Sequence, residues 1–133
     1  MPLKLTAEEI ALAAARAASD KRGSGIVVLD LRQISVITDY FVIVDAGTEV
    51  QVRAIAEGIQ EALVERGVTT LRREGWEDAR WVLLDYGDAV VHVFRTEERE
   101  YYDLERLWGD APRLVLDEEE TGLVLEERRD GRP

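Results

Sequence analysis

Residues 81–94 constrain the fold most, because two short apolar runs flank a two-residue turn. The segment reads Trp-Val-Leu-Leu-Asp-Tyr-Gly-Asp-Ala-Val-Val-His-Val-Phe. Gly at the first central position suits a type II′ β-hairpin, whose twist matches that of the strands. Folding the segment about Gly87-Asp88 creates three facing pairs, which are Tyr86–Ala89, Leu84–Val91 and Val82–Val93. Side chains alternate with a period of two along a strand, so these six share one apolar face, which we expect in the core.

The opposite face of the hairpin has a mixed character. It carries Trp81, Leu83, Asp85, Val90, His92 and Phe94. The histidine is the only one in the chain. We expect Trp81 to be at least partly exposed, since the alternate strand positions already supply a buried face. The use of this second face is the functional question that the hairpin raises.

Length and composition limit the possible classes of protein. With 133 residues and 46% apolar content, the chain predicts one domain with a real core. It has no cysteine, which excludes disulfides and thiolate catalysis. The N-terminus lacks the apolar core of a signal peptide, and no apolar run could span a membrane, so we expect a cytoplasmic protein. The net charge of −11 disfavours non-specific nucleic-acid binding and suits a basic protein partner.

The remaining patterns predict a mixed α/β domain. Capping signals at Thr6 and Thr48 begin two helices. Apolar runs at 25–30 and 39–44 predict strands, the second of them central. Residues 69–74, which include two Arg, predict a short strand at an edge. With the hairpin and a last helix after it, the order becomes α-β-β-α-β-β-β-α. The fold class is therefore a single mixed β-sheet of about five strands flanked by helices.

The last helix and the C-terminal stretch are predicted in less detail. Thr96 is expected to cap the helix, whose apolar stripe consists of Tyr101, Leu104, Leu107 and Trp108. We divide the chain into a domain over residues 1–113 and an acidic extension over residues 114–133. The extension fits either an extra hairpin, with Thr121-Gly122 in its turn, or a mobile tail. The last five residues are expected to be disordered.

No complete catalytic or metal-binding constellation is present in the sequence. His92 and Asp85 are the one His–carboxylate pair, but no Ser lies in a nucleophile-elbow context. Gly23-Ser24-Gly25 before a strand is typical of a nucleotidyltransferase opening. That chemistry needs paired carboxylates on the next strand, and Asp30-Leu31-Arg32 supplies only one. We therefore expect no catalytic residue, cofactor or metal, and keep a nucleotide-binding or nucleotidyltransferase-like enzyme as the alternative.

Several motifs together resemble one known family. They are Ser35-Val-Ile-Thr-Asp-Tyr-Phe-Val-Ile43, Ala54-Ile-Ala56, Glu74-Gly75, Trp81 to Asp88, Val91 to Phe94 and Tyr102-Asp-Leu-Glu-Arg-Leu-Trp108. In this order and spacing they resemble the ribosomal silencing factor family, also called Iojap, over about residues 6–113. One departure is the turn Asp45-Ala46-Gly47-Thr48, where the family usually has a Thr-Gly-Asn/Thr-Ser turn. The cap survives as Thr48, so we expect a rebuilt turn without loss of function.

The resemblance implies a function as well as a fold. Members have a nucleotidyltransferase-like fold without transferase activity. They bind the large ribosomal subunit through large-subunit protein fourteen, block its joining with the small subunit and so repress translation when nutrients are scarce. Free members often form homodimers. Carried onto this sequence, the contact surface would centre on Trp81, Leu83, Asp85 and His92, with Glu74, Asp88, Tyr102 and Leu104 nearby.

Overall fold

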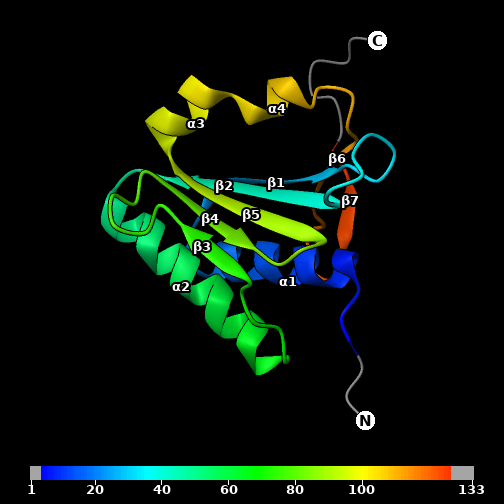
Figure 1. Ribbon diagram of the computed structural model, residues 1–133, viewed down its shortest axis with the longest axis horizontal. Helices are drawn as coiled ribbons and strands as arrows, with labels where there is room; N and C mark the ends of the chain where they lie inside the picture. The colour runs from blue at the N-terminus through cyan, green and yellow to red at the C-terminus, as the bar shows by residue number, and fades with distance from the viewer. Residues whose placement is uncertain (1–3, 127–133) are drawn as a thin grey trace.

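The computed structural model describes residues 4–126 and contains four helices and seven strands within them. In chain order these are α1 (Ala7–Asp20), β1 (Ser24–Asp30), β2 (Tyr40–Ala46), α2 (Glu49–Glu65), β3 (Arg72–Glu74), β4 (Trp81–Asp85), β5 (Ala89–Arg95), α3 (Thr96–Tyr102), α4 (Leu104–Leu107), β6 (Arg113–Leu116) and β7 (Leu123–Leu125). The thin grey ends in Figure 1 lie outside the described residues, and they include the last five residues that were expected to be disordered.

All strands form one mixed sheet in the order β3-β4-β5-β2-β1-β6-β7. β2 and β5 are parallel, and every other neighbouring pair is antiparallel. Helices α1 and α2 lie on one face of the sheet, and α3 and α4 lie on the other (Figure 1). The predicted fold class is confirmed, with β2 at the centre and β3 at an edge as expected.

The C-terminal stretch accounts for the difference in strand number. The sheet has seven strands instead of the expected five or so, because residues 113–125 form the hairpin β6–β7. β6 pairs with β1, so this segment extends the main sheet. Of the two structures considered for the extension, the extra hairpin is the one observed as far as residue 126. Residues 127–133 lie outside the described part of the chain.

The central hairpin has the predicted register. Val82 faces Val93 and Leu84 faces Val91, while the Tyr86 N–H donates to the Ala89 carbonyl at 2.9 Å. All six residues of the predicted apolar face are buried in the core beneath α1 and α2. Gly87 has φ +87°, which the first central position of a type II′ turn requires.

The segment after β5 differs from its prediction in two ways. Thr96 is the first residue of α3 and not its cap, and its hydroxyl donates to Asp45 Oδ1 at 3.0 Å. The expected single helix is divided at Asp103, which has left-handed backbone angles of φ 51° and ψ 53°. This break shifts the helical phase, so the predicted stripe is wrong in half of its members: Tyr101 and Leu107 are 81% and 74% exposed.

A cluster of hydrogen bonds and ion pairs links both short helices to the sheet. Arg99 of α3 donates to Asp45 Oδ2 at 2.9 Å and to the Gly25 carbonyl at 2.7 Å. Its other nitrogens donate to both carboxylate oxygens of Glu105 in α4, at 3.1 and 2.9 Å. Glu105 also accepts from Arg113 of β6 at 2.9 Å. The side chains of Arg99 and Asp45 are only 13% and 12% exposed, so this cluster is largely shielded from water.

Candidate functional site: a pocket on the open part of the sheet

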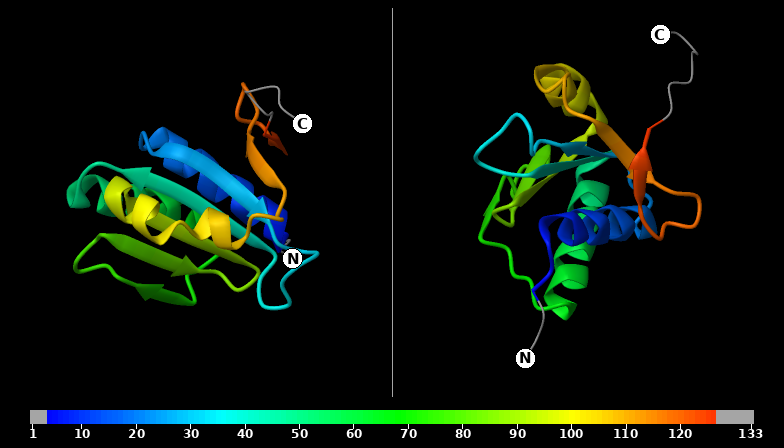
Figure 2. Two further views of the ribbon diagram at one scale, coloured as in Figure 1. Left: turned by 90° about the horizontal axis from the view of Figure 1, so that it is seen from above. Right: turned by 90° about the vertical axis from the view of Figure 1, so that its right-hand side faces the viewer.

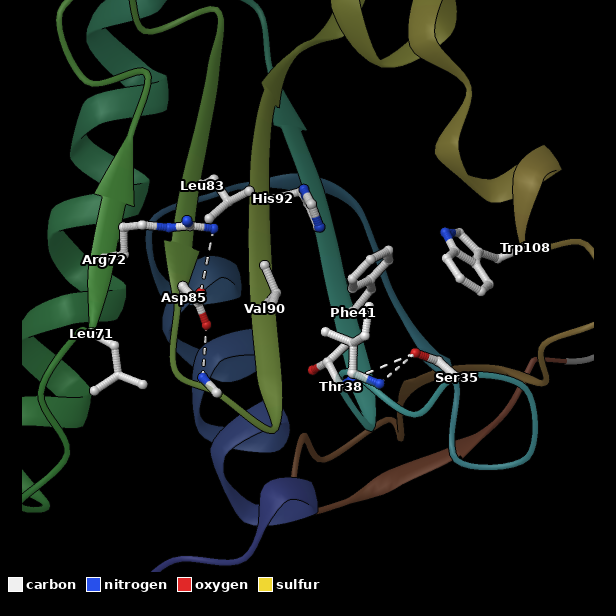
Figure 3. Close-up of a pocket in the computed structure, with 12 residues that line it drawn as sticks. Ser35, Thr38, Phe41, Leu71, Arg72, Leu83, Asp85, Val90, His92 and Trp108 are labelled. Atoms are coloured by element: carbon white, nitrogen blue, oxygen red, sulfur yellow. Dashed lines mark hydrogen bonds and ion pairs between the residues drawn. The ribbon is translucent and has the colours of Figure 1, made fainter.

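The face of the sheet that carries α3 and α4 is only partly covered. The left view of Figure 2 shows these helices over β5 and β2, with β3 and β4 lying to one side. A pocket of about 400 Å³ opens where the cover ends. Its lining consists of Ser35, Ile37, Thr38, Phe41, Leu71, Arg72, Leu83, Asp85, Gly87, Val90, His92 and Trp108. These residues come from strands β2, β3, β4 and β5, from the β4–β5 turn, and from the loops before β2, before β3 and after α4 (Figure 3).

Aromatic side chains form one wall of the pocket. Phe41 of β2 stands edge-on to Trp108, with ring centroids 5.8 Å apart, and edge-on to His92 at 4.5 Å. Such edge-to-face contacts add to the stabilisation from burial alone. Figure 3 shows His92, Phe41 and Thr38 following one another along this wall, with Trp108 facing Phe41 from the α4 side.

Exposed apolar side chains border the pocket. Leu71 is 72% exposed and Ile37 is 86% exposed, and both belong to the lining. Val36, the sequence neighbour of Ile37, is fully exposed at 103% but is not part of the lining. We call these three side chains the apolar rim. Single exposed apolar residues are ordinary, but several beside an apolar pocket are characteristic of a contact site.

One ion pair lies on the β3–β4 side of the pocket, near the β4–β5 turn. Arg72 Nη2 lies 3.6 Å from Asp85 Oδ2. The other carboxylate oxygen of Asp85 accepts from the Gly87 N–H at 2.8 Å, which fixes its orientation beside the turn. Arg72 is 61% exposed, and its Nε lies 3.2 Å from Oε2 of Glu74, so the guanidinium already faces two carboxylates.

His92 lies deeper than its place on the hairpin suggested. It is 4% exposed, and its Nδ1 accepts from the Trp81 Nε1–H at 3.1 Å. Burial lowers the pKa of the imidazole to about 4, because charging a group away from water is unfavourable. At neutral pH the side chain is therefore uncharged and cannot take part in an ion pair.

The predicted contact residues fall into two groups. Leu83, Asp85 and His92 line the pocket, whereas the other five lie outside its lining. Of these, Trp81 is half-buried as expected, with its ring 4.8 Å from that of Tyr102, and Leu104 packs in the small core cluster on this side of the sheet. Glu74 and Asp88 are exposed at the edge of the site. The part that each plays in partner binding stays a prediction.

Sequence reasoning missed most of the apolar lining. Ile37, Leu71 and Phe41 come from two connectors and a strand start that the hairpin pattern does not include. A usable signal was present in the connector before β2, where Ile34, Val36 and Ile37 bring apolar side chains into a loop. All three are exposed, which is unusual for a loop without a partner.

The described residues supply no sign of metal chemistry. Between residues 4 and 126, no three His, Asp or Glu side chains converge as a possible metal site. Asp30, the one carboxylate at the nucleotidyltransferase-like position, is paired with Arg32 at 2.7 Å. No helix in this part of the chain is both long and apolar enough to cross a bilayer.

Comparison with known proteins gives a consistent picture. The family described as "Ribosomal silencing factor during starvation" matches residues 4–132, so the match runs past residue 113, where the resemblance in the motifs ended. A ribosomal silencing factor of Bacillus subtilis is 50% identical over 104 residues, which are 78% of this chain and 88% of the relative. That of Halalkalibacterium halodurans is 46% identical over 110 residues, or 83% and 94% of the two chains.

A solved structure agrees with the sequence comparisons. The crystal structure of a protein from Chromobacterium violaceum superposes with a TM-score of 0.77 at 37% identity, covering 79% of this chain and 88% of that one. The identities, the coverage and the shared fold lead to one assignment. The chain belongs to the ribosomal silencing factor family.

Proposed function

We propose that the protein binds the large ribosomal subunit through large-subunit protein fourteen and thereby blocks joining of the small subunit. Translation would be repressed in this way when nutrients are limiting. The docking surface consists of the pocket and its apolar rim. The observation that carries this proposal is the exposure of Leu71 and Ile37, at 72% and 86%, on the border of an apolar pocket. A surface of this kind is costly to leave in water and gains free energy when a partner covers it.

Charge supports a ribosomal partner. The chain has 28 acidic and 17 basic residues, whereas proteins that hold ribosomal RNA need Lys and Arg to contact phosphate. An acidic protein is therefore attracted to the exposed basic surface of a ribosomal protein and repelled by bare RNA. This complementarity would speed association and select protein over RNA as the contact.

Blocking by occupation needs no catalysis. A stable interface takes about 800 Å² from each partner, and this chain has 8361 Å² of accessible surface. Roughly nine-tenths of the surface would then remain as a bulky obstacle on the large subunit. The small subunit could not approach the covered site until the protein dissociated.

Introduction of a negative charge at the apolar rim tests the proposal. We expect Leu71→Asp and Ile37→Asp each to weaken binding to purified large subunits by roughly 30-fold, the equivalent of an interface residue contributing about 2 kcal/mol. Both side chains are exposed, so the fold should be unaffected. Val50→Asp is the matched control, since Val50 is 76% exposed on α2, and α2 lies on the face of the sheet opposite α3 and α4 (Figure 1).

Binding is read by co-sedimentation, and blocking by the amount of joined ribosomes in a sucrose gradient. Wild type and the Val50 variant should reduce joining equally, and the two rim variants should not. Undiminished binding by both rim variants would show that the docking surface lies elsewhere. Binding without any effect on joining would refute the blocking mechanism while leaving the docking surface intact.

We further propose that the free protein forms a homodimer that uses the same apolar rim. Self-association would shield Leu71 and Ile37 from water while no ribosome is bound. Light scattering should give a dimer mass for wild type and a monomer mass for Leu71→Asp. A wild-type dimer that persists in the presence of excess large-subunit protein fourteen would show that the two interfaces are separate.

A further inference from the structure

Two buried polar atoms in the pocket have no hydrogen-bond partner. Within the described part of the chain, Nε2 of His92 and Oγ1 of Thr38 are both inaccessible and unpaired. The two residues are 4% and 6% exposed, and both line the pocket. Buried polar groups in folded proteins are nearly always paired, so two exceptions in one cavity call for an explanation.

The hydrogen-bonding character of His92 Nε2 follows from its neighbour. An indole N–H can only donate, and the Trp81 Nε1–H points at Nδ1 of His92 at 3.1 Å. Nδ1 must then be the unprotonated acceptor, and a neutral imidazole carries its single proton on the other nitrogen. Nε2 of His92 therefore carries the proton, and this buried donor has no acceptor among the described residues.

We propose that the pocket receives a neutral oxygen acceptor from the docked protein partner, carried on a side chain with an apolar stem. The oxygen accepts from His92 Nε2–H, which docking must first uncover because this nitrogen has no accessible surface in the free protein. The Thr38 hydroxyl pairs with a second polar atom of the partner. This inference rests on the proposed function, because it names the chemistry by which the partner fills the pocket. Amide or hydroxyl side chains such as those of Gln, Asn or Thr have the required form.

Two observations select this occupant. A molecule small enough to fill 400 Å³ would leave Val36, Ile37 and Leu71 in water around it, whereas a protein covers the pocket and the apolar rim together. The only charged groups in the lining, Arg72 and Asp85, already pair with each other. An inserted charge would thus lose its hydration without a free counter-charge, which favours a neutral group.

The single histidine makes a direct test possible. In 15N-labelled full-length protein, the imidazole gives one set of nitrogen and proton signals because no second histidine is present. On addition of unlabelled large-subunit protein fourteen, we expect the Nε2–H proton to move downfield and to exchange more slowly with water. We also expect the backbone amides of Ile37 and Leu71 to shift as the rim is covered.

The outcomes separate this inference from the proposed function. Shifted rim amides with unchanged imidazole signals would show that the partner docks without filling the pocket, and would overturn the inference alone. Unchanged signals at both places under saturating partner would overturn the proposed docking surface. Changes at both places support both.

Removal of the Thr38 hydroxyl gives a second test. Thr38→Val keeps the shape and replaces an unpaired buried oxygen by a methyl group, so thermal stability should stay the same or rise. Binding to large subunits should nevertheless weaken roughly five- to tenfold, the loss of one hydrogen bond. If the hydroxyl had only a structural role, its removal would lower stability and leave affinity unchanged, and that result would contradict the inference. Thr69→Val, at an exposed position outside the pocket, is the control.

Discussion

Acidification should destabilise the protein through His92. In the native state burial lowers the pKa of this imidazole from 6.5 to about 4, whereas in the unfolded chain it keeps its ordinary value. Between pH 7 and pH 5 the unfolded state therefore binds a proton that the native state does not. By linkage, the free energy of unfolding falls as the pH falls through this window, and the loss is complete below about pH 4.

The size of the effect follows from the two pKa values. The unfolded imidazole is largely protonated at pH 5 and largely neutral at pH 7, while the native imidazole stays neutral at both. The free energy of unfolding is therefore lower at pH 5 by about 2 kcal/mol. That is a large fraction of the 5–15 kcal/mol that stabilises a typical domain. Because the chain has one histidine, no other side chain with an ordinary pKa titrates strongly in this range.

Urea denaturation at pH 7 and pH 5 measures the effect, with His92→Phe as the comparison. The variant loses the Trp81 hydrogen bond, so its stability may be read only as a difference between the two pH values. Carboxylates contribute equally to both proteins, and the wild type should lose about 2 kcal/mol more than the variant on acidification. Equal losses in the two proteins would refute the assignment of a buried, neutral His92.

Two further predictions concern the framework of the site. Gly75→Ala should destabilise the protein by about 1–3 kcal/mol, because Gly75 has φ +79° and an added Cβ would lie 2.0 Å from the Trp81 carbonyl oxygen. Urea denaturation measures the loss, and Gly47→Ala is the control because nothing lies within 4 Å of a Cβ added there. Arg99→Met should cost about 3 kcal/mol by the same assay, since it leaves the shielded carboxylates of Asp45 and Glu105 without their shared partner.

Each of these variants has an outcome that would contradict the reasoning. Gly75→Ala with the stability of wild type would mean that the β3–β4 connection yields easily. For Arg99, the matched comparison is Arg32→Met, which breaks a pair whose arginine is 55% exposed and should cost 1 kcal/mol or less. If the two arginine variants lost equal stability, the cluster beneath α3 and α4 would behave as an ordinary surface network.

Local patterns in the sequence were enough to predict the framework of the sheet. The parity of residues 81–94 predicted the register of the β4–β5 hairpin, because a strand with one buried face allows only one pairing. The apolar run at 39–44 predicted the central strand, and Thr6 with Glu9 predicted the capping box that begins α1. In each case the physical cause lies within a few residues of the signal.

The candidate site depends on contacts that no local pattern contains. The alternation of side chains along the hairpin predicted that His92 and Phe94 share a face of mixed character. Both are buried because α3 and α4 pack over this face. The break at Asp103 uses a left-handed conformation, which Asp adopts more readily than most residues other than Gly and Asn, but a lone Asp in a helical pattern does not predict it. Leu71 reaches the pocket only because β3 pairs with β4.

Site-specific photo-crosslinking to purified large subunits identifies the ribosomal component that contacts the apolar rim. A photoreactive amino acid at position 37 lies on the apolar rim, and the same group at position 50 lies on α2 across the sheet. We predict that position 37 crosslinks to large-subunit protein fourteen, identified by mass spectrometry, and that position 50 gives no product. Crosslinks from position 50 alone, or from position 37 only to another ribosomal component, would contradict the account.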